Sequence, residues 1–342
     1  MGAAVTSRSS RDVRTKRALI TGISGQDGSY LAEVLLEKGR DVHGMVRKLG
    51  PEFPARLAHL RDRIALHQGD LANASSMEEL ISRVEPDEIY HLAAETSVSA
   101  CMEFPEAAWQ ITGLGPERVF DAVRKHAPGA RIFHASSSEV FGEPKETPQS
   151  ETTPFHPRND YGRAKAYAHR MAHHYRERHR LFIGVGILFN HESPRRGARF
   201  LTRKVSHSVA KIALGQDREL HLGDLHARRD WGYAGDFARA MPLILEADAP
   251  EDFVIGTGMA HSVEDFVRAA FNHVGLDWHD YVVIDRELMR PQESGIVQAD
   301  PSKAKTVLDW EPSISFEELA AMMVEAEMTS LRGGRSAQSN VA

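Results

Sequence analysis

A tyrosine and a lysine four residues apart give this sequence a candidate acid-base pair. Tyr161 and Lys165 have the spacing that places two side chains on one face of a helix. An ammonium beside a phenol favours the phenolate, so the pair predicts a tyrosine pKa lowered from about 10 toward a value suited to base catalysis. The spacing alone is common. It gains weight from Ser137 and Glu139, a hydroxyl and a carboxylate that follow a predicted strand.

A glycine-rich turn near the N-terminus is the second candidate site. The apolar run Arg17 to Thr21 leads into this turn, and an amphipathic segment, Ser29 to Lys38, follows it and ends before Gly39. Glycines permit a tight turn and a close approach to a pyrophosphate, and a helix N-terminus favours its charge. The turn therefore predicts a dinucleotide site, although a ligand-free strand-to-helix turn stays open at this point. The contacts expected are Gly22, Gly25, Gln26, Asp27 and Gly28.

The residues after the second predicted strand bear on the choice between NAD and NADP. An acidic residue there would bind the ribose 2′-hydroxyl of NAD, whereas basic residues can accommodate the 2′-phosphate of NADP. Arg47 and Lys48 stand at this position, which favours NADP. Asp70 and Leu71, after the third predicted strand, are expected to contact the adenine. Leu92, Ala93 and Ala94, after the fourth, are expected to contact the nicotinamide half.

The elements that must position these residues follow an alternating pattern of strands and helices. Such alternation predicts an α/β protein with a Rossmann-type, doubly wound parallel sheet. Ser76 to Val84 is one of the intervening helical stretches. The six strands expected are Arg17 to Thr21, Asp41 to Val46, Arg63 to Gln68, Glu88 to Ala93, Arg131 to Ala135 and Phe182 to Leu188.

The alternation breaks after Asn190, which predicts a second, smaller lobe of mixed α/β structure. Its expected helices are Lys204 to Leu214, Val263 to Val274 and Phe316 to Met328. The domain prediction is a disordered tail over 1–16, an NADP-binding domain over 17–190, a mainly substrate-binding lobe over 191–330 whose segment near 230–260 returns to the first domain, and a disordered tail over 331–342.

Composition excludes several classes of protein. A net charge of -6 argues against a general nucleic-acid binder, and no apolar run approaches the ~20 residues that span a bilayer. The single cysteine, Cys101, excludes an intramolecular disulfide framework and fits a reducing compartment. We therefore expect a cytoplasmic protein without a membrane or nucleic-acid partner, and we interpret Cys101 as a packing residue.

These features together resemble the extended short-chain dehydrogenases that act on nucleotide sugars. The resemblance narrows at the string Asn190 to Gly197, with Arg229 to Gly232 and Arg290 to Glu293. Those strings are similar to the GDP-mannose 4,6-dehydratase family, and the similarity runs from about Arg17 to about Met328.

The resemblance implies an NADP-dependent 4,6-dehydration of a GDP-hexose, with GDP-mannose as the expected substrate. Tyr161 would take the proton of the sugar 4-hydroxyl, supported by Lys165, while hydride passes to NADP and Ser137 bonds O4. Glu139 would serve as the acid and base at C5 and C6. The family's positions add His191 and Arg196 to the cofactor contacts and Asn190, Lys204, Arg229, Arg290 and Glu293 to the substrate contacts. They imply no metal ligand and a homo-oligomer, either a dimer or a tetramer.

The chain departs from the family in four places. Ser137 stands where threonine is usual, Glu95 and Thr96 replace Gln-Ser, and Asn159 and Asp160 replace Ser-Pro before the tyrosine. The loop after Arg47 also lacks the serine-rich run that in the family reaches a neighbouring subunit's cofactor, which leaves dimer or tetramer open. Three other readings remain: the same dehydration of a GDP-heptose, a reductase or epimerase of the same superfamily, and a non-catalytic NADP-binding regulator. An epimerase needs Tyr161 and Lys165 but not Glu139.

Overall fold

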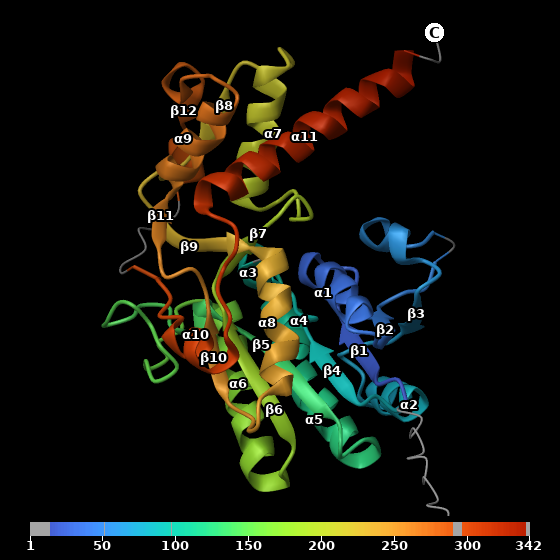
Figure 1. Ribbon diagram of the computed structural model, residues 1–342. Helices are drawn as coiled ribbons and strands as arrows, with labels where there is room; N and C mark the ends of the chain where they lie inside the picture. The colour runs from blue at the N-terminus through green and yellow to red at the C-terminus, as the bar shows by residue number, and fades with distance from the viewer. Residues whose placement is uncertain (1–13, 51, 97, 290–295, 340–342) are drawn as a thin grey trace, which may run out of the picture.

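The computed structural model describes residues 14–50, 52–96, 98–289 and 296–339 (Figure 1). Most of the predicted N-terminal tail, residues 1–13, and residues 340–342 of the predicted C-terminal tail lie outside this range. None of the helices among the described residues combines the length and the apolar character needed to cross a bilayer.

A seven-stranded parallel sheet forms the centre of the molecule, with strand order β10-β6-β5-β4-β1-β2-β3. The chain runs outward from β1 to β3 in one direction and from β4 to β10 in the other, so the order reverses between β1 and β4. In doubly wound sheets, ligands bind at the carboxyl edge near this reversal. The predicted fold class is confirmed. The strands are β1 (Arg17–Thr21), β2 (Asp41–Val46), β3 (Ile64–Gln68), β4 (Glu88–His91), β5 (Arg131–Ser137), β6 (Phe182–Leu188) and β10 (Asp252–Ile255).

Helices cover both faces of this sheet (Figure 1). Alternate side chains of each strand point to opposite faces, so two apolar cores form. Ile20, Phe133 and Phe253 are buried on one face and Leu19 and Ile132 on the other. The first face carries α1 (Gln26–Glu37), α8 (Ala234–Glu246) and α10 (Ser302–Leu308), and the second carries α2 (Ala74–Val84), α5 (Leu114–His126) and α6 (Asp160–His179).

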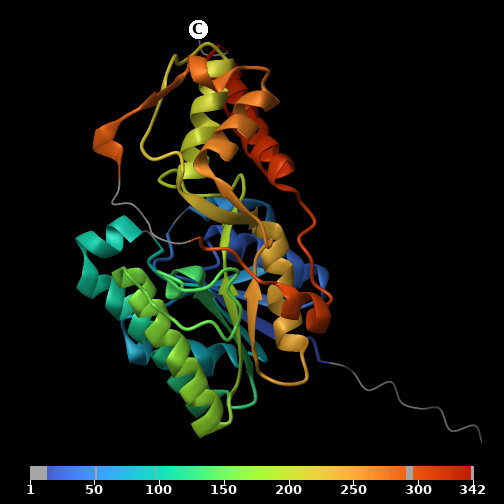
Figure 2. The same ribbon diagram turned by 90° about the vertical axis from the view of Figure 1, so that its left-hand side faces the viewer.

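A smaller set of elements has its own core. Figure 2 shows these elements stacked above the large sheet, and β7 follows the carboxyl end of β6 directly. Trp231, Phe266, Phe316 and Met323 pack together there. The elements are a three-stranded sheet of β7 (Asn190–Glu192), β9 (Arg228–Tyr233) and β11 (Ala260–Ser262), the pair β8 (Leu220–Leu222) and β12 (Val282–Ile284), and the helices α7 (Leu201–Ala213), α9 (Val263–His273) and α11 (Phe316–Ser339).

Several element boundaries differ from those expected. Strand β5 extends past Ala135 to Ser137, because Ser136 and Ser137 pair with Ile187 and Leu188 of β6. Helix α1 begins at Gln26 rather than Ser29, so the glycine turn is shorter than the pattern suggested. Helix α11 runs on to Ser339, past the expected end at Met328.

Candidate active site

The predicted catalytic residues meet where β5 ends and α6 begins. Ser137 is the last residue of β5, Glu139 lies in the short helix η3 (Ser138–Val140), and Tyr161 lies in the first turn of α6. A side-chain carbon on Gly162 would stand 2.4 Å from the carbonyl oxygen of Glu139, so only glycine lets α6 approach η3 this closely. Segments about twenty residues apart are thereby brought to one edge of the sheet.

Tyr161 is buried at this edge. Burial raises the pKa of Tyr161 above its usual range, and a hydrogen bond with the Ser137 side chain acts in the opposite direction. The expected lowering of this pKa by Lys165 is therefore not what the structure shows. The reason is geometric: Nζ of Lys165 lies 5.9 Å from the Tyr161 ring centroid and donates to the carbonyl oxygen of Ala135 over 2.8 Å.

Lys165 is itself perturbed by its surroundings. It is 4% exposed, and burial lowers its pKa to about 8 from 10.5. An ammonium with this pKa exchanges its proton near neutral pH, which suits a group next to a general base.

The carboxylate of Glu139 is held by Asn159. Nδ2 of Asn159 donates to Oε2 of Glu139 over 2.7 Å, and Oδ1 of Asn159 accepts from the backbone N–H of Gly162 over 2.7 Å. Asn159 is the N-cap of α6, so one side chain fixes both the helix start and the carboxylate. Sequence reasoning noted Asn159 as a departure from the family but gave it no role. Its place two residues before Tyr161, at an N-cap, was the available signal.

The glycine turn has the geometry of a phosphate cradle. Gly25 is the N-cap of α1, and no side chain among the described residues caps the N-terminus of this helix with a hydrogen bond. The first-turn N–H groups thus face a position suited to an anion. A side-chain carbon on Gly28 would stand 2.4 Å from the carbonyl oxygen of Gly22, so glycine is needed for α1 to pack on the turn. These residues fit the pyrophosphate of a dinucleotide.

The segment after β6 packs onto this turn. Nε2 of Gln26 donates to the carbonyl oxygen of His191 over 3.1 Å, and Oγ of Ser193 donates to Oε1 of Gln26 over 2.8 Å. Nε2 of His191 lies 3.0 Å from Oδ2 of Asp27. Burial raises the pKa of Asp27, but His191, Gln26 and Arg196 together outweigh this effect and lower the pKa to about 2. Burial lowers the pKa of His191, and Asp27 raises it overall. A half-buried ion pair therefore joins the two predicted cofactor segments.

Arg196 lies between the cofactor turn and the tyrosine. Its Nε is 3.0 Å from Oε2 of Glu192, and its guanidinium lies 3.6 Å from the centroid of the Phe200 ring. Its positive charge lowers the pKa of both Asp27 and Tyr161. Arg196 is thus fixed by its neighbours near both parts of the site.

The remaining predicted cofactor residues lie along the carboxyl edge of the same strands. Arg47 and Lys48 are exposed after β2, and Asp70 is exposed after β3. Leu71 is buried in the core beside α2 instead of presenting its side chain at the edge. Leu92, Ala93 and Ala94 follow β4 and are half-buried, with the N–H of Ala93 donating to Oγ1 of Thr21 over 3.2 Å.

The predicted substrate residues are more dispersed. Asn190 begins β7, beside His191. Lys204 lies on α7, where its Nζ donates to the carbonyl oxygen of His221 over 2.8 Å, and Arg229 lies on β9, where its Nη1 donates to the carbonyl oxygen of Arg228 over 2.7 Å. These contacts lie within the smaller set of elements. Arg290 and Glu293 lie outside the described residues.

Cys101 also borders the site. It is fully buried and packs with Ala108 and Tyr161, and its Sγ donates to the carbonyl oxygen of Glu95 over 3.5 Å. Burial raises the pKa of Cys101 to about 11. The thiol is therefore protonated at neutral pH, as expected of a packing residue.

Comparison with known proteins gives a consistent result. The model of the family described as GDP-mannose 4,6 dehydratase matches residues 19–323. The chain is 45% identical over 325 residues to GDP-mannose 4,6 dehydratase 2 of Arabidopsis thaliana, covering 92% of this chain and 87% of that protein. It is 44% identical over 342 residues to GDP-mannose 4,6 dehydratase of Homo sapiens, covering 92% of each. The crystal structure of UDP-glucose 4-epimerase from Thermotoga maritima with UDP-glucose superposes with a TM-score of 0.81 at 25% identity, covering 92% of this chain and 99% of that one.

Proposed function

We propose, because this chain belongs to the GDP-mannose 4,6-dehydratase family, that it converts GDP-mannose to GDP-4-keto-6-deoxymannose with NADP as cofactor. The observation that carries the proposal is the carboxylate of Glu139, held by Asn159 within reach of the Ser137 and Tyr161 pair. Oxidation at C4 needs the tyrosine and lysine but not Glu139. A dehydration needs a further acid and base, and Glu139 supplies one.

The first step concerns the sugar 4-hydroxyl. Tyr161, as phenolate, takes the hydroxyl proton while the Ser137 hydroxyl bonds O4. Burial disfavours a phenolate, whereas the hydrogen bond with Ser137 and the nearby charge of Arg196 favour it. NADP, when bound, would supply a hydride acceptor for C4 and a hydride donor for C6, with no net change of the cofactor over a turnover.

The second step concerns C5 and C6. A carbonyl at C4 acidifies the proton on C5, and the Glu139 carboxylate takes that proton. The same group, now a carboxylic acid, protonates the C6 hydroxyl, which leaves as water. One water is lost and the carboxylate is restored. Hydride addition at C6 then requires a proton at C5, and Tyr161 returns the proton that it took from the 4-hydroxyl, so both residues end in their starting forms. The hydrogen bond from Asn159 fixes which oxygen of Glu139 faces the sugar.

The cofactor and the nucleotide are assigned to different parts of the molecule. The uncapped start of α1 suits the cofactor pyrophosphate, and the exposed Arg47 and Lys48 after β2 support NADP over NAD. The cations Lys204 and Arg229, with Arg290, suit the pyrophosphate of the GDP-sugar. A cytosolic location and a homo-oligomer, dimer or tetramer, remain predictions from the sequence.

The test is to incubate the purified chain with GDP-mannose, a GDP-heptose, and UDP- and dTDP-hexoses, and to analyse the products by mass spectrometry. We expect loss of water and a 4-keto product from GDP-mannose. Dehydration of the GDP-heptose alone would move the substrate assignment to that sugar. An isomerised or reduced product without loss of water would contradict the dehydratase proposal.

A further inference from the structure

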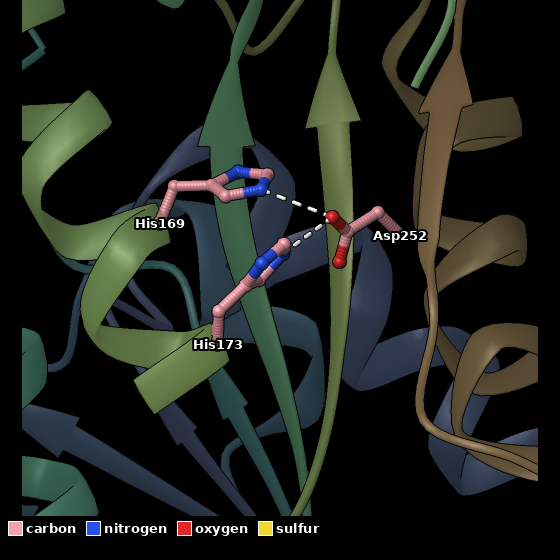
Figure 3. A group of neighbouring side chains, drawn as sticks. All are labelled: His169, His173 and Asp252. Carbon is pink, nitrogen blue, oxygen red and sulfur yellow. Dashed lines mark hydrogen bonds and ion pairs between the residues drawn. The ribbon is translucent and has the colours of Figure 1, made fainter. Parts of the chain in front are cut away.

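Two histidines and an aspartate converge away from the residues assigned above. His169 and His173 occupy successive turns of α6, and both rings point at Asp252, the first residue of β10 (Figure 3). Oδ2 of Asp252 lies 3.1 Å from Nε2 of His169 and 2.6 Å from Nε2 of His173. Their three ligand atoms all lie within 4.8 Å of one another.

A second set of contacts orients these groups from behind. Nδ1 of His169 lies 3.1 Å from Oγ of Ser136, and Oδ1 of Asp252 accepts from Nη2 of Arg176 over 2.8 Å. In His169 and Asp252, the atom that faces the centre of the cluster is thus separate from the atom that holds the ring or the carboxylate in place. Histidines and carboxylates that bind metals are supported in this way, through the atom that does not face the ion.

Burial also suits a cation. The side chains of His169 and Asp252 are 4% and 11% exposed, whereas that of His173 is 43% exposed and gives access from solvent. The Asp252 carboxylate pairs with Arg176 over 2.8 Å, which favours the ionised form that binds a metal.

We infer that His169, His173 and Asp252 form a binding site for one divalent transition-metal ion of the Zn²⁺ class. Two imidazole nitrogens and one carboxylate oxygen are a ligand set for zinc, cobalt, nickel or iron, whereas Mg²⁺ and Ca²⁺ favour oxygen ligands throughout. Water at the half-exposed side of His173 completes the coordination. The competing arrangement is a metal-free network in which Arg176 alone balances the charge of Asp252.

The bound ion would join α6 to β10, the edge strand of the large sheet. Tyr161, Lys165, His169 and His173 follow one another at intervals of four residues along α6, so each lies about one turn from the next. The ion therefore stabilises the helix that carries the catalytic pair without touching the substrate. This inference does not depend on the proposed function.

The test uses the full chain, first stripped of metal by a chelator and then titrated with Co²⁺ and Zn²⁺. We expect one equivalent of Co²⁺ to bind with the visible d–d absorption of a low-coordinate site, Zn²⁺ to displace it, and Zn²⁺ to raise the melting temperature. His173→Ala should weaken binding at least tenfold and abolish the rise, while the dehydratase activity without added metal stays unchanged. His174→Ala, which removes an exposed imidazole from the same helix, is the matched control and should behave as wild type.

Asp252→Asn provides a second variant that keeps the shape and removes the charge, and it should also lose the metal. Circular dichroism establishes that each variant is folded. Absence of a saturable one-equivalent site in the wild-type chain would overturn the inference and leave an ion-pair network only. Equal Co²⁺ affinity in wild type and His173→Ala would overturn it as well.

Discussion

Nδ2 of Asn159 donates a 2.7 Å hydrogen bond to Oε2 of Glu139, while Oδ1 of the same side chain caps α6. The helix that carries Tyr161 and Lys165 and the carboxylate assigned to the second half of the reaction are therefore fixed by one residue. A serine at this position, as in the family, would retain the cap but has no amide to offer Glu139. Substitutions of Asn159 can therefore separate its role in capping α6 from its role in holding Glu139.

Asn159→Asp should slow dehydration while leaving the fold intact. The aspartate retains an oxygen that accepts from Gly162, but it places a second carboxylate against Glu139, and adjacent like charges disfavour ionisation. We expect kcat to fall roughly ten- to a hundredfold, a range below the full worth of a general acid and base. The acid limb of the pH–rate profile should move to higher pH.

Asn159→Ala is the companion variant, because it removes the cap as well and should cost about 1 kcal/mol of stability. If the role of Asn159 were purely structural, Asn159→Ala would be destabilised and would have low activity, whereas Asn159→Asp would keep the wild-type pH–rate profile.

Lys165 should make the stability of the folded chain depend on pH in the alkaline range. Its pKa is about 8 in the folded chain and 10.5 unperturbed, so between these values the unfolded chain holds a proton that the folded chain has released. Stability therefore rises with pH in this interval, by roughly 2 kcal/mol between about pH 8 and about pH 10. Urea unfolding of wild type and Lys165→Met should show this gain in the wild type alone. Parallel curves for the two proteins would mean that Lys165 keeps its ordinary pKa.

Arg47 should determine cofactor choice. We expect NADP to bind at least about tenfold more tightly than NAD, or about 1.4 kcal/mol, because a guanidinium can pair with the 2′-phosphate. Arg47→Ala should narrow the gap by weakening NADP, as measured by fluorescence titration of both nucleotides. Arg83→Ala, an exposed arginine of α2, is the control. Equal affinities of the wild type for both nucleotides would refute the assignment.

Arg229 and Arg290 should act on substrate binding. If each contacts the pyrophosphate in the ground and transition states alike, Arg229→Ala and Arg290→Ala should raise KM for the GDP-sugar with little change in kcat. The effect should be on the order of tenfold, since a hydrogen bond to a charged group contributes about 1.5 kcal/mol or more. Arg228→Ala, whose exposed guanidinium bonds the carbonyl oxygen of Ala260, is the neighbouring control. Unchanged KM in both variants would make the two arginines structural or solvated.

Local patterns were enough to predict six of the seven strands of the large sheet, but not β10 (Asp252–Ile255) at its edge. Strand Phe182–Leu188 is almost wholly buried and reads as a continuous apolar run, so its bounds agree with the structure. Strand Asp41–Val46 also has the expected bounds, although Asp41 is exposed and His43 is half-buried. The short strands β7, β9 and β11 were not expected, because three to six residues of mixed polarity carry no clear period. Their pairing depends on contacts far apart in the chain, such as Asn190 opposite Trp231.

The catalytic set could be proposed from the sequence because its members occupy recognisable places: a strand end, an N-terminal helical turn and an i, i+4 pair. The pKa shifts of these residues could not be predicted from the sequence. The direction of the Tyr161 pKa shift depends on burial that the sequence does not show. The His169, His173 and Asp252 cluster was missed because its third member lies on β10, far along the chain from α6.

The most direct test of the proposed mechanism is the absorbance of bound NADPH after GDP-mannose is added to Glu139→Gln. The glutamine keeps the size of the side chain and can still contact Asn159, but it cannot transfer a proton. C4 oxidation, which needs Tyr161 and Lys165, should proceed and convert bound NADP to NADPH, giving new near-ultraviolet absorbance.

The rate of water release by Glu139→Gln should be about 10²- to 10⁴-fold lower than that of the wild type. Tyr161→Phe should show neither the absorbance nor the product. Turnover of Glu139→Gln at close to the wild-type rate would contradict the role assigned to Glu139.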